Sequence, residues 1–247
     1  MDSGERGGSA IRSVPSPCTR RAHGRIAHRL PRAEGIYDRD GYAEAMGDTD
    51  PARSLREEVA AHRDPDHDVD PLFVNRWSPR AMSGEPLDEA DYRPLFEAAR
   101  WAPSSRNSQP WRFAYAARGD DEWETFVELL NDFNGTWAVD AAVLVVVFSE
   151  TTDEEGRSLS AHTFDTGAAW QNLALEGARR GLVVHPMGGF DHDAAAAELD
   201  APDDYAVEAM VAIGERAPAE SLPEDLRDGE VPSGRTPLDE FVTRGGF

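Results

Sequence analysis

The sequence predicts an α+β fold in which helices flank one sheet. Several stretches place apolar side chains at helical spacing, and short apolar runs typical of strands lie between them. Residues 141–148 form an unbroken apolar run, which indicates a strand buried on both faces. The 247 residues suffice for one domain with a full core. No glycine-rich dinucleotide or phosphate loop occurs, so we predict a mixed sheet rather than a Rossmann domain.

Four stretches have helical periodicity: residues 91–101, 121–133, 163–180 and 191–199. Asp91 is expected to cap the first helix, which carries Pro94 in its first turn, where a missing donor costs little. The third helix is apolar around most of its circumference and ends at Gly181. It therefore needs a second surface to bury against, and a partner subunit is the simplest candidate.

Four other stretches are typical of strands: residues 112–117, 141–148, 182–185 and 205–213. A polar loop over residues 151–160 follows the second strand. Gly188 and Gly189 follow the third strand, and glycine lets a backbone approach a planar ligand closely. The sequence thus predicts a ligand-facing turn at the end of that strand.

The composition divides the chain into three parts. Residues 1–45 carry 8 Arg against 6 Asp and Glu without a periodic apolar pattern, so we predict a disordered N-terminal extension. A genuine basic arm and a true start at Met46 are the alternatives. Residues 46–70 form an acidic lead-in and linker with a short helical stretch over 54–61, and their histidines lack a framework that would fix a metal geometry. Residues 71–247 form the folded domain with a C-terminal arm.

The charge pattern indicates the environment in which the protein works and the partners that are not expected. The net charge is -22, and all 25 basic residues are arginine. An acidic surface without lysine stays hydrated where salt screens its self-repulsion, which predicts a halophile and excludes nucleic acid as an expected partner. Cys18 is the only cysteine, so no disulfide framework is expected and a reducing cytoplasm fits. No apolar run reaches membrane-spanning length, so no membrane partner is expected.

Three polar segments carry the candidate site. The segment Ala102–Trp111 (APSSRNSQPW) contains two prolines and reads either as a rigid ligand-facing loop or as an ordinary helix exit. The segment Arg76–Arg80 (RWSPR) places two arginines and Ser78 on one side, as in an anion site or a surface arginine pair. The third segment, Pro186–Phe190 (PMGGF), contains the two glycines that follow the predicted strand.

In their order and spacing, these three segments resemble the FMN-dependent nitroreductase family. The likeness extends from about Leu72 to about Arg235. The resemblance implies a mixed, mainly antiparallel sheet flanked by helices, in a homodimer with flavin at the interface. Together with the acidic composition it indicates a halophilic member of that family.

The resemblance also implies which side chains hold FMN. Arg76 and Ser78, with Arg235 from the C-terminal arm, would hold the phosphate and the ribityl chain. Arg80 would face the N1/O2 edge of the flavin, where a cation stabilises the negative charge gained on reduction. Asn134 would lie at the pyrimidine ring.

Two loops would complete the flavin site. The backbone of the turn after the third strand would cover the isoalloxazine and aim an N–H at N5; its residues are Pro186, Met187, Gly188 and Gly189. The partner subunit would contribute the loop residues Pro103, Ser104, Ser105 and Asn107. Trp137 stands where some family members carry a lysine, which leaves the redox potential open. No metal and no catalytic side chain are implied, because flavin N5 carries the chemistry.

The resemblance implies a ping-pong oxidoreductase that takes hydride from NADH or NADPH. The acceptor would be a nitroaromatic, a quinone or a related electrophile. The loop between Phe148 and His162 is short, so the lid that narrows specificity in some members is expected to be missing. Two alternatives remain: another flavin reaction, such as dehalogenation or flavin fragmentation, and a flavin-binding protein without turnover.

Overall fold

The computed structural model describes residues 54–246. All of them belong to the compact unit Gly47–Phe247. The expectation of a disordered extension over residues 1–45 lies outside the described residues, as does the first part of the predicted lead-in.

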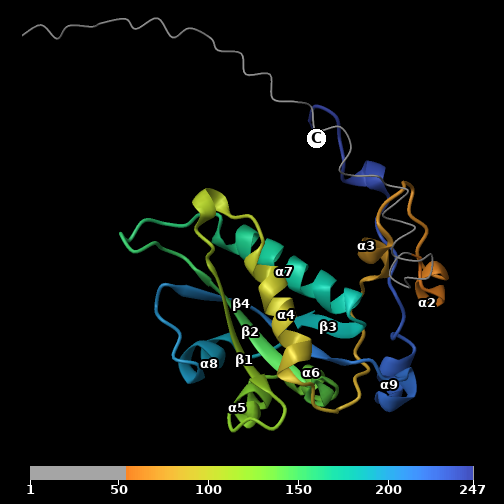
Figure 1. The fold of residues 1–247 in the computed structure, drawn as a ribbon, viewed down its shortest axis with the longest axis horizontal. Coiled ribbons are helices and arrows are strands. Elements are labelled where there is room, and N and C mark those ends of the chain that lie inside the picture. The colour runs from red at the N-terminus through yellow and green to blue at the C-terminus, as the bar shows by residue number, and fades with distance from the viewer. Residues whose placement is uncertain (1–53, 247) are drawn as a thin grey trace, which may run out of the picture. The chain divides into compact units, whose positions relative to one another are not determined.

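Four strands form one sheet (Figure 1). They are β1 (Trp111–Ala117), β2 (Val143–Glu150), β3 (Leu182–Met187) and β4 (Tyr205–Glu215). The strand order is β1-β2-β4-β3, and each neighbouring pair is antiparallel. The α+β class and the antiparallel character of the sheet are therefore confirmed, whereas the predicted mixed pairing is not, because the sheet of the described residues contains no parallel pair. Each predicted strand is present, with β3 continuing through Pro186 to Met187.

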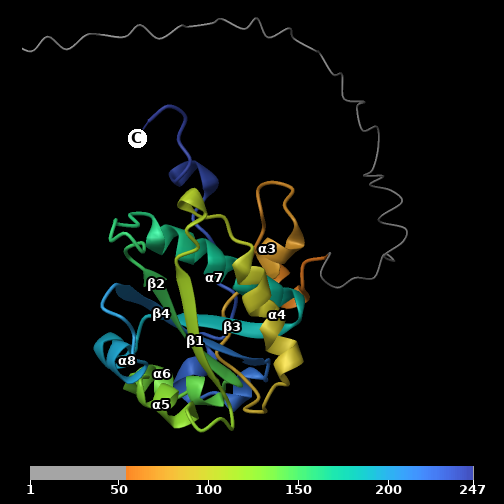
Figure 2. The same cartoon turned by 60° about the vertical axis from the view of Figure 1, so that its left-hand side comes forward.

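Alternate side chains of β2 build the two halves of the core. Leu144, Val146 and Phe148 belong to one cluster with residues of the helices α5 (Trp123–Glu128) and α8 (His192–Glu198). The side chains of the other face of β2 pack with those of α4 (Glu89–Arg100) and α7 (His162–Arg179). Seen in two views, the α4–α7 pair and the α5–α8 pair lie on opposite sides of the sheet (Figure 1, Figure 2). The unbroken apolar pattern of this strand thus reflects burial on both faces, as predicted.

The predicted helix over residues 121–133 is confirmed for Trp123–Glu128 and is wrong beyond Glu128, where the helix is interrupted. Helix α5 ends at Glu128, and a separate turn α6 (Asp132–Gly135) follows. Between them Leu130 forms a bridge with Phe190, and the Asn131 N–H donates to the Gly189 carbonyl over 3.3 Å. These pairings use backbone groups that a continuous helix would need. Phe133, at the end of the predicted helix, is 50% exposed.

Helix α4 begins three residues earlier than the predicted cap at Asp91 would place it. Asp88, not Asp91, occupies the N-cap position, although its side chain makes no capping hydrogen bond. Pro94 consequently lies inside the helix rather than in its first turn. Helix α8 is confirmed and is capped by Asp191, whose carboxylate accepts from the Ala194 N–H.

Short elements flank the sheet domain in the chain. Helices α2 (Glu57–Ala60), α3 (Pro71–Asn75) and α9 (Glu224–Arg227) are one turn each. Shorter 3-10 turns span Ser105–Asn107, Ala138–Asp140, Ala219–Ser221 and Leu238–Glu240. Within residues 54–246, none of the helices is long and apolar enough to cross a membrane.

The described part of the lead-in packs against the domain. The buried Asn75 side chain accepts from the Arg56 N–H at 2.9 Å and donates to the Ser54 carbonyl at 2.8 Å. Val59 is fully buried, and the Arg56 side chain donates to the Ala178 carbonyl near the end of α7. Hydrogen bonds to a buried amide therefore hold a segment that its polar composition had identified as linker.

Helix α7 approaches the sheet closely at Gly177. A Cβ atom at this position would lie 2.3 Å from Val184 Cγ2 on β3 and 3.3 Å from Leu95 Cδ2 on α4. Gly167, in the same helix, is exposed and has no such neighbour within 4 Å. The absence of a side chain at Gly177 thus sets the distance between α7, α4 and β3.

We expect Gly177→Ala to destabilise the protein and Gly167→Ala not to. Overpacking a core typically costs about 1–3 kcal/mol, which exceeds the roughly 1 kcal/mol that alanine gains over glycine in a helix. At Gly167 only the helical gain applies, so the free energy of unfolding should stay equal or rise. Urea unfolding of both variants measures the difference. An equal loss at both positions would show that α7 itself, rather than the Val184 contact, responds to the substitution.

Candidate functional site

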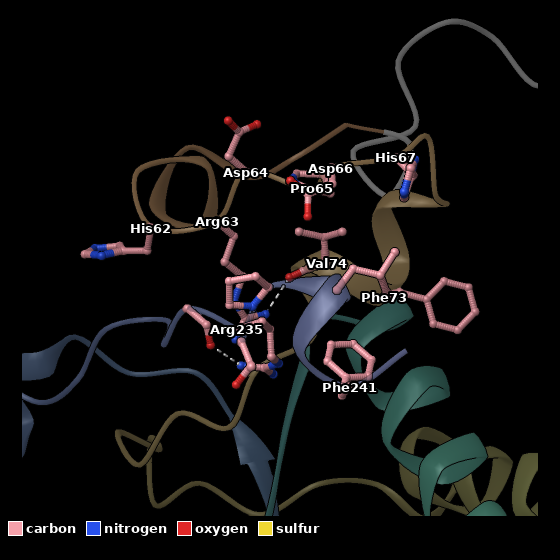
Figure 3. Close-up of a pocket in the computed structure, with 14 residues that line it drawn as sticks. His62, Arg63, Asp64, Pro65, Asp66, His67, Phe73, Val74, Arg235 and Phe241 are labelled. Atoms are coloured by element: carbon pink, nitrogen blue, oxygen red, sulfur yellow. Dashed lines mark hydrogen bonds between the residues drawn. The ribbon is translucent and has the colours of Figure 1, made fainter. Parts of the chain in front are cut away.

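Arg63 and Arg235 extend into one cavity of about 550 Å³ between the lead-in and the C-terminal arm (Figure 3). The Arg63 Nε donates to the Ser233 carbonyl at 2.8 Å, and Arg235 Nη1 donates to the same oxygen at 3.2 Å. Two cations therefore share one neutral acceptor. The Asp64 carboxylate, although in the wall of this cavity, points away from both guanidinium groups (Figure 3).

Arg76 completes this arginine cluster, which we define as Arg63, Arg76 and Arg235. The Arg63 Nη1 donates to the Arg76 carbonyl at 3.0 Å, and Arg76 Nη1 donates to Ser78 Oγ at 3.3 Å. Burial lowers the pKa of Arg63, as do the like charges of Arg235 and Arg76. Burial and the charge of Arg235 likewise lower the pKa of Arg76. The structure thus brings Arg76, Ser78 and Arg235 together, as the family resemblance implied.

No carboxylate among residues 54–246 forms an ion pair with the arginine cluster. This is unusual in a chain with 47 acidic and 25 basic residues. Arginine side chains close to one another repel, and a planar guanidinium matches phosphate oxygens with paired hydrogen bonds. The cluster therefore has the charge and the donors of a phosphate site.

The backbone at Arg80 is held by the buried carboxylate of Glu230. The Arg80 N–H donates to both carboxylate oxygens at 2.9 and 3.0 Å, and the Ala81 N–H donates at 2.9 Å. Arg216 Nη1 lies 3.3 Å from the same carboxylate, whose side chain is 0% exposed. Glu230 thereby fixes the position of Arg80 in space. The sequence gives no local signal for this role, because Glu230 is one acid among many in the C-terminal arm.

The side chain of Arg80 lies beside Phe133. Its Cζ is 6.0 Å from the centre of that ring, and its buried Nε has no hydrogen-bond partner in the described part of the chain. An unsatisfied buried donor on a cation is costly, which is a sign of a functional position.

His185 packs against the segment that carries Arg80. Its Nδ1 lies 2.7 Å from the Pro79 carbonyl, so Nδ1 carries the proton, and its ring lies 4.5 Å from that of Trp137. Trp137 is 1% exposed and belongs to the core. Burial lowers the pKa of His185, and the charge of Arg80 adds to this effect. His185 is therefore a neutral, packed histidine.

The turn after β3 lies next to Asn134. The Asn134 amide donates to the Gly189 carbonyl at 2.8 Å. A Cβ on Gly189 would lie 2.6 Å from Asn131 Nδ2 and 2.7 Å from Asn134 Nδ2, so a side chain has no room there. A Cβ on Gly188 would meet nothing within 4 Å, which leaves its backbone open to a ligand. Segments 76–80, 133–137 and 185–189 therefore meet at one place.

The loop Pro103–Gln109 lies at the opposite end of α7. The Ser105 N–H donates to the carboxylate of Asp165, in the first turn of that helix, at 2.9 Å. The Ser104 Oγ accepts from the Gln109 N–H at 3.0 Å. Three residues of this loop, none of them glycine, have positive φ: Arg106 (54°), Asn107 (58°) and Gln109 (49°). Such strained positions cluster at binding sites, which favours the ligand-facing interpretation of this loop over an ordinary helix exit.

One chain does not bring this loop to the arginine cluster. Arg56, in the lead-in, contacts α7 at Ala178, whereas the loop contacts it at Asp165. A helix rises about 1.5 Å per residue, which separates these two contacts by about 20 Å. Figure 1 shows the loop and α3 at opposite ends of α7. Pro103, Ser104, Ser105 and Asn107 therefore cannot join the other predicted site residues within one subunit.

The fold belongs to the nitroreductase-like class of α+β proteins. A solved structure described as an oxidoreductase containing FMN is 44% identical, with 75% of this chain and 96% of that chain covered and a TM-score of 0.73. Residues 74–153 and 122–215 match the sequence profile of the Nitroreductase family. These matches together span more than half of the chain, and the chain belongs to this family.

Two curated relatives carry different names. The "Putative NADH dehydrogenase/NAD(P)H nitroreductase" of Rhodopseudomonas palustris is 27% identical over 55% of this chain and 78% of that protein. The 5,6-dimethylbenzimidazole synthase of Rhodospirillum rubrum is 28% identical over 65% of this chain and 88% of that protein. The family thus includes members whose names denote different chemistry.

We expect the buried neutral His185 to make stability depend on pH. The fold lowers its pKa, so below about pH 6.5 the unfolded chain takes up a proton that the folded chain resists. Stability contributed by neutral His185 is therefore lost as the pH falls below this value. In His185→Asn, which retains a donor, the free energy of unfolding should fall less between pH 7.5 and 5.5 than it does in the wild type. The slopes of the two proteins should differ by at most about 1.4 kcal/mol per pH unit.

Urea unfolding at the two pH values tests this, with His62→Asn as the control at an exposed histidine. Identical pH slopes in the wild type and in His185→Asn would contradict the assignment.

Proposed function

We propose that the protein is an FMN-dependent oxidoreductase that takes hydride from NADH or NADPH and passes electrons to a nitroaromatic, a quinone or a related electrophile. The observation that carries this proposal is the arginine cluster without acidic partners, beside an open glycine turn, in a chain of the Nitroreductase family. The FMN named for a relative at 44% identity supports the cofactor, and the name of the R. palustris relative supports the nicotinamide donor.

The residues of the site fit FMN. Arg76, Arg235 and Ser78 would hold the phosphate and the ribityl chain. The open backbone at Gly188, with Pro186, Met187 and Gly189, would cover the ring system, and Asn134 would approach its pyrimidine edge while it holds the turn. Arg80, whose buried Nε is unsatisfied, would provide a cation at the N1/O2 edge.

We also propose a homodimer in which the partner's loop completes each site. The separation of Ser104 and Ser105 from the arginine cluster along α7 supports this arrangement. Two large apolar side chains near that helix are exposed, Phe164 at 82% and Trp101 at 71%, and burial in an interface would remove them from water. We further propose, from the composition alone, that the protein works in the cytoplasm of a halophile.

In the proposed reaction, the side chains of the protein bind the flavin and adjust its electrostatics. Bound FMN supplies reversible acceptance and donation of two electrons. Arg80 would supply a positive charge beside the bound flavin, and Glu230 keeps Arg80 in place through its backbone. The chain therefore binds, orients and adjusts electrostatics, and no side chain needs to act as acid or base.

Flavin fragmentation is the second candidate function. The specific observation in its favour is the similarity to the 5,6-dimethylbenzimidazole synthase of R. rubrum, at 28% identity over 65% of this chain. This reaction would consume the flavin, whereas the first candidate would return it unchanged. A flavin-binding protein without turnover remains the third candidate.

The function is tested with full-length protein purified in high salt. We expect a visible flavin spectrum, and oxidation of NADH or NADPH that accelerates when a quinone or a nitroaromatic compound is added. Flavin recovered unchanged after many turnovers supports the first candidate. Loss of flavin with appearance of a benzimidazole supports the second, and a flavin that neither donor reduces supports a binding protein. A colourless protein that takes up no added FMN would contradict all three.

We expect Arg80→Ala to lower the flavin midpoint potential while FMN affinity falls less than in Arg76→Ala. Loss of a charge-assisted hydrogen bond costs about 1.5–3 kcal/mol, and about 1.4 kcal/mol corresponds to roughly 30 mV for two electrons, so a drop of some tens of millivolts is expected. Spectroelectrochemical titration measures the potential. An unchanged midpoint together with ready loss of FMN would assign Arg80 to the phosphate instead.

A further inference from the structure

We propose that Arg63 is a third phosphate ligand, and that the arginine cluster selects a flavin that ends in a phosphate monoester over one without it. This inference rests on the proposed function. Arg63 lies before the residues that match the family profile, 74–215, and no sequence motif identified it. The geometry of its guanidinium carries the argument.

The backbone around Arg63 fixes one side of the guanidinium and leaves the other available. Nε donates to the Ser233 carbonyl, and Nη1 donates to the carbonyls of Val74 at 2.6 Å and Arg76 at 3.0 Å. The hydrogen bonds of Nε and Nη1 hold the planar group in one orientation. Nη2 donates to no acceptor in the described residues, so it can bind an external anion.

These same contacts join the three segments that carry the arginine cluster. Arg63 binds the carbonyl of Arg76 itself, and it shares the Ser233 carbonyl with Arg235. The guanidinium groups are close enough that the charge of Arg235 lowers the pKa of both Arg63 and Arg76. Backbone carbonyls thus hold cations together against their mutual repulsion, which costs free energy until an anion arrives.

The chemistry of the cluster favours a dianion. A phosphate monoester presents three terminal oxygens and has a second pKa near 6, so it carries close to two negative charges at neutral pH. Three guanidinium groups supply more donors than a single carboxylate can accept. Riboflavin, which lacks the phosphate, would gain nothing from Arg63.

The test measures binding of FMN and of riboflavin to full-length protein freed of flavin, by quenching of flavin fluorescence. The variants are Arg63→Gln, Arg63→Lys and the control Arg93→Gln, an exposed arginine that pairs with Glu89 on α4. We expect Arg63→Gln to weaken FMN binding on the order of 10- to 100-fold and to leave riboflavin binding within about twofold. Arg63→Lys should fall between, and the control should match the wild type.

The pH dependence provides a second readout. As the phosphate loses its second proton near pH 6, the preference of the wild type for FMN over riboflavin should rise between pH 5 and 7.5. The rise should be smaller in Arg63→Gln, because one of three cations is gone. Unchanged FMN binding in this variant overturns the proposal, and so does an equal loss of both flavins, which would make Arg63 a structural residue only.

Failure of the proposed function is distinguishable from failure of this inference. If the wild type binds neither flavin, the proposed function falls, and inorganic phosphate becomes the probe. Phosphate that raises the melting temperature of the wild type more than that of Arg63→Gln would retain Arg63 as an anion ligand. Equal shifts in the two proteins would overturn that role as well.

Discussion

The candidate site depends on the hydrogen bonds and the ion pair that the buried carboxylate of Glu230 forms. A carboxylate removed from water costs several kcal/mol unless hydrogen bonds and a counter-charge replace the solvent. Here the N–H groups of Arg80 and Ala81 and the side chain of Arg216 supply both. Because Glu230 belongs to the C-terminal arm and Arg80 to the start of the domain, this contact joins segments 150 residues apart. The side chain of Glu230 therefore sets the position of Arg80 and places a negative charge beside its backbone.

Charge is distributed unevenly between the site and the rest of the chain. The chain has a net charge of -22, yet it contains a cluster of arginines that backbone carbonyls, rather than carboxylates, hold in place. A neutral acceptor orients a guanidinium without cancelling its charge. The chain thus keeps a local positive potential within a strongly negative field. Such a contrast guides a phosphate to one place and leaves few other surfaces that attract it.

Periodicity predicted the sheet and most helices, because β2 and α7 carry their burial pattern in their own residues. Periodicity failed where backbone groups that are distant in the sequence take the hydrogen bonds that a helix would need. Leu130 and Asn131 look helical, yet they pair with the turn at Phe190 and Gly189. Arg76, Ser78 and the glycines could be named as candidates because they lie in compact motifs. Arg63 and Glu230 were not, since each is a single charge in a polar stretch whose meaning arises only from long-range contacts.

In the proposed homodimer, the loop that follows α4 would contact the partner subunit. Arg106, Asn107 and Gln109 are held in a conformation that residues other than glycine avoid, and the Asp165 carboxylate secures the loop from the side of α7. Strain of this kind persists only where the surrounding contacts impose it, so the loop is shaped before any partner arrives. Its ordering entropy has then already been lost during folding of the single chain. Assembly would therefore resemble the docking of two finished surfaces more than the folding of one upon the other.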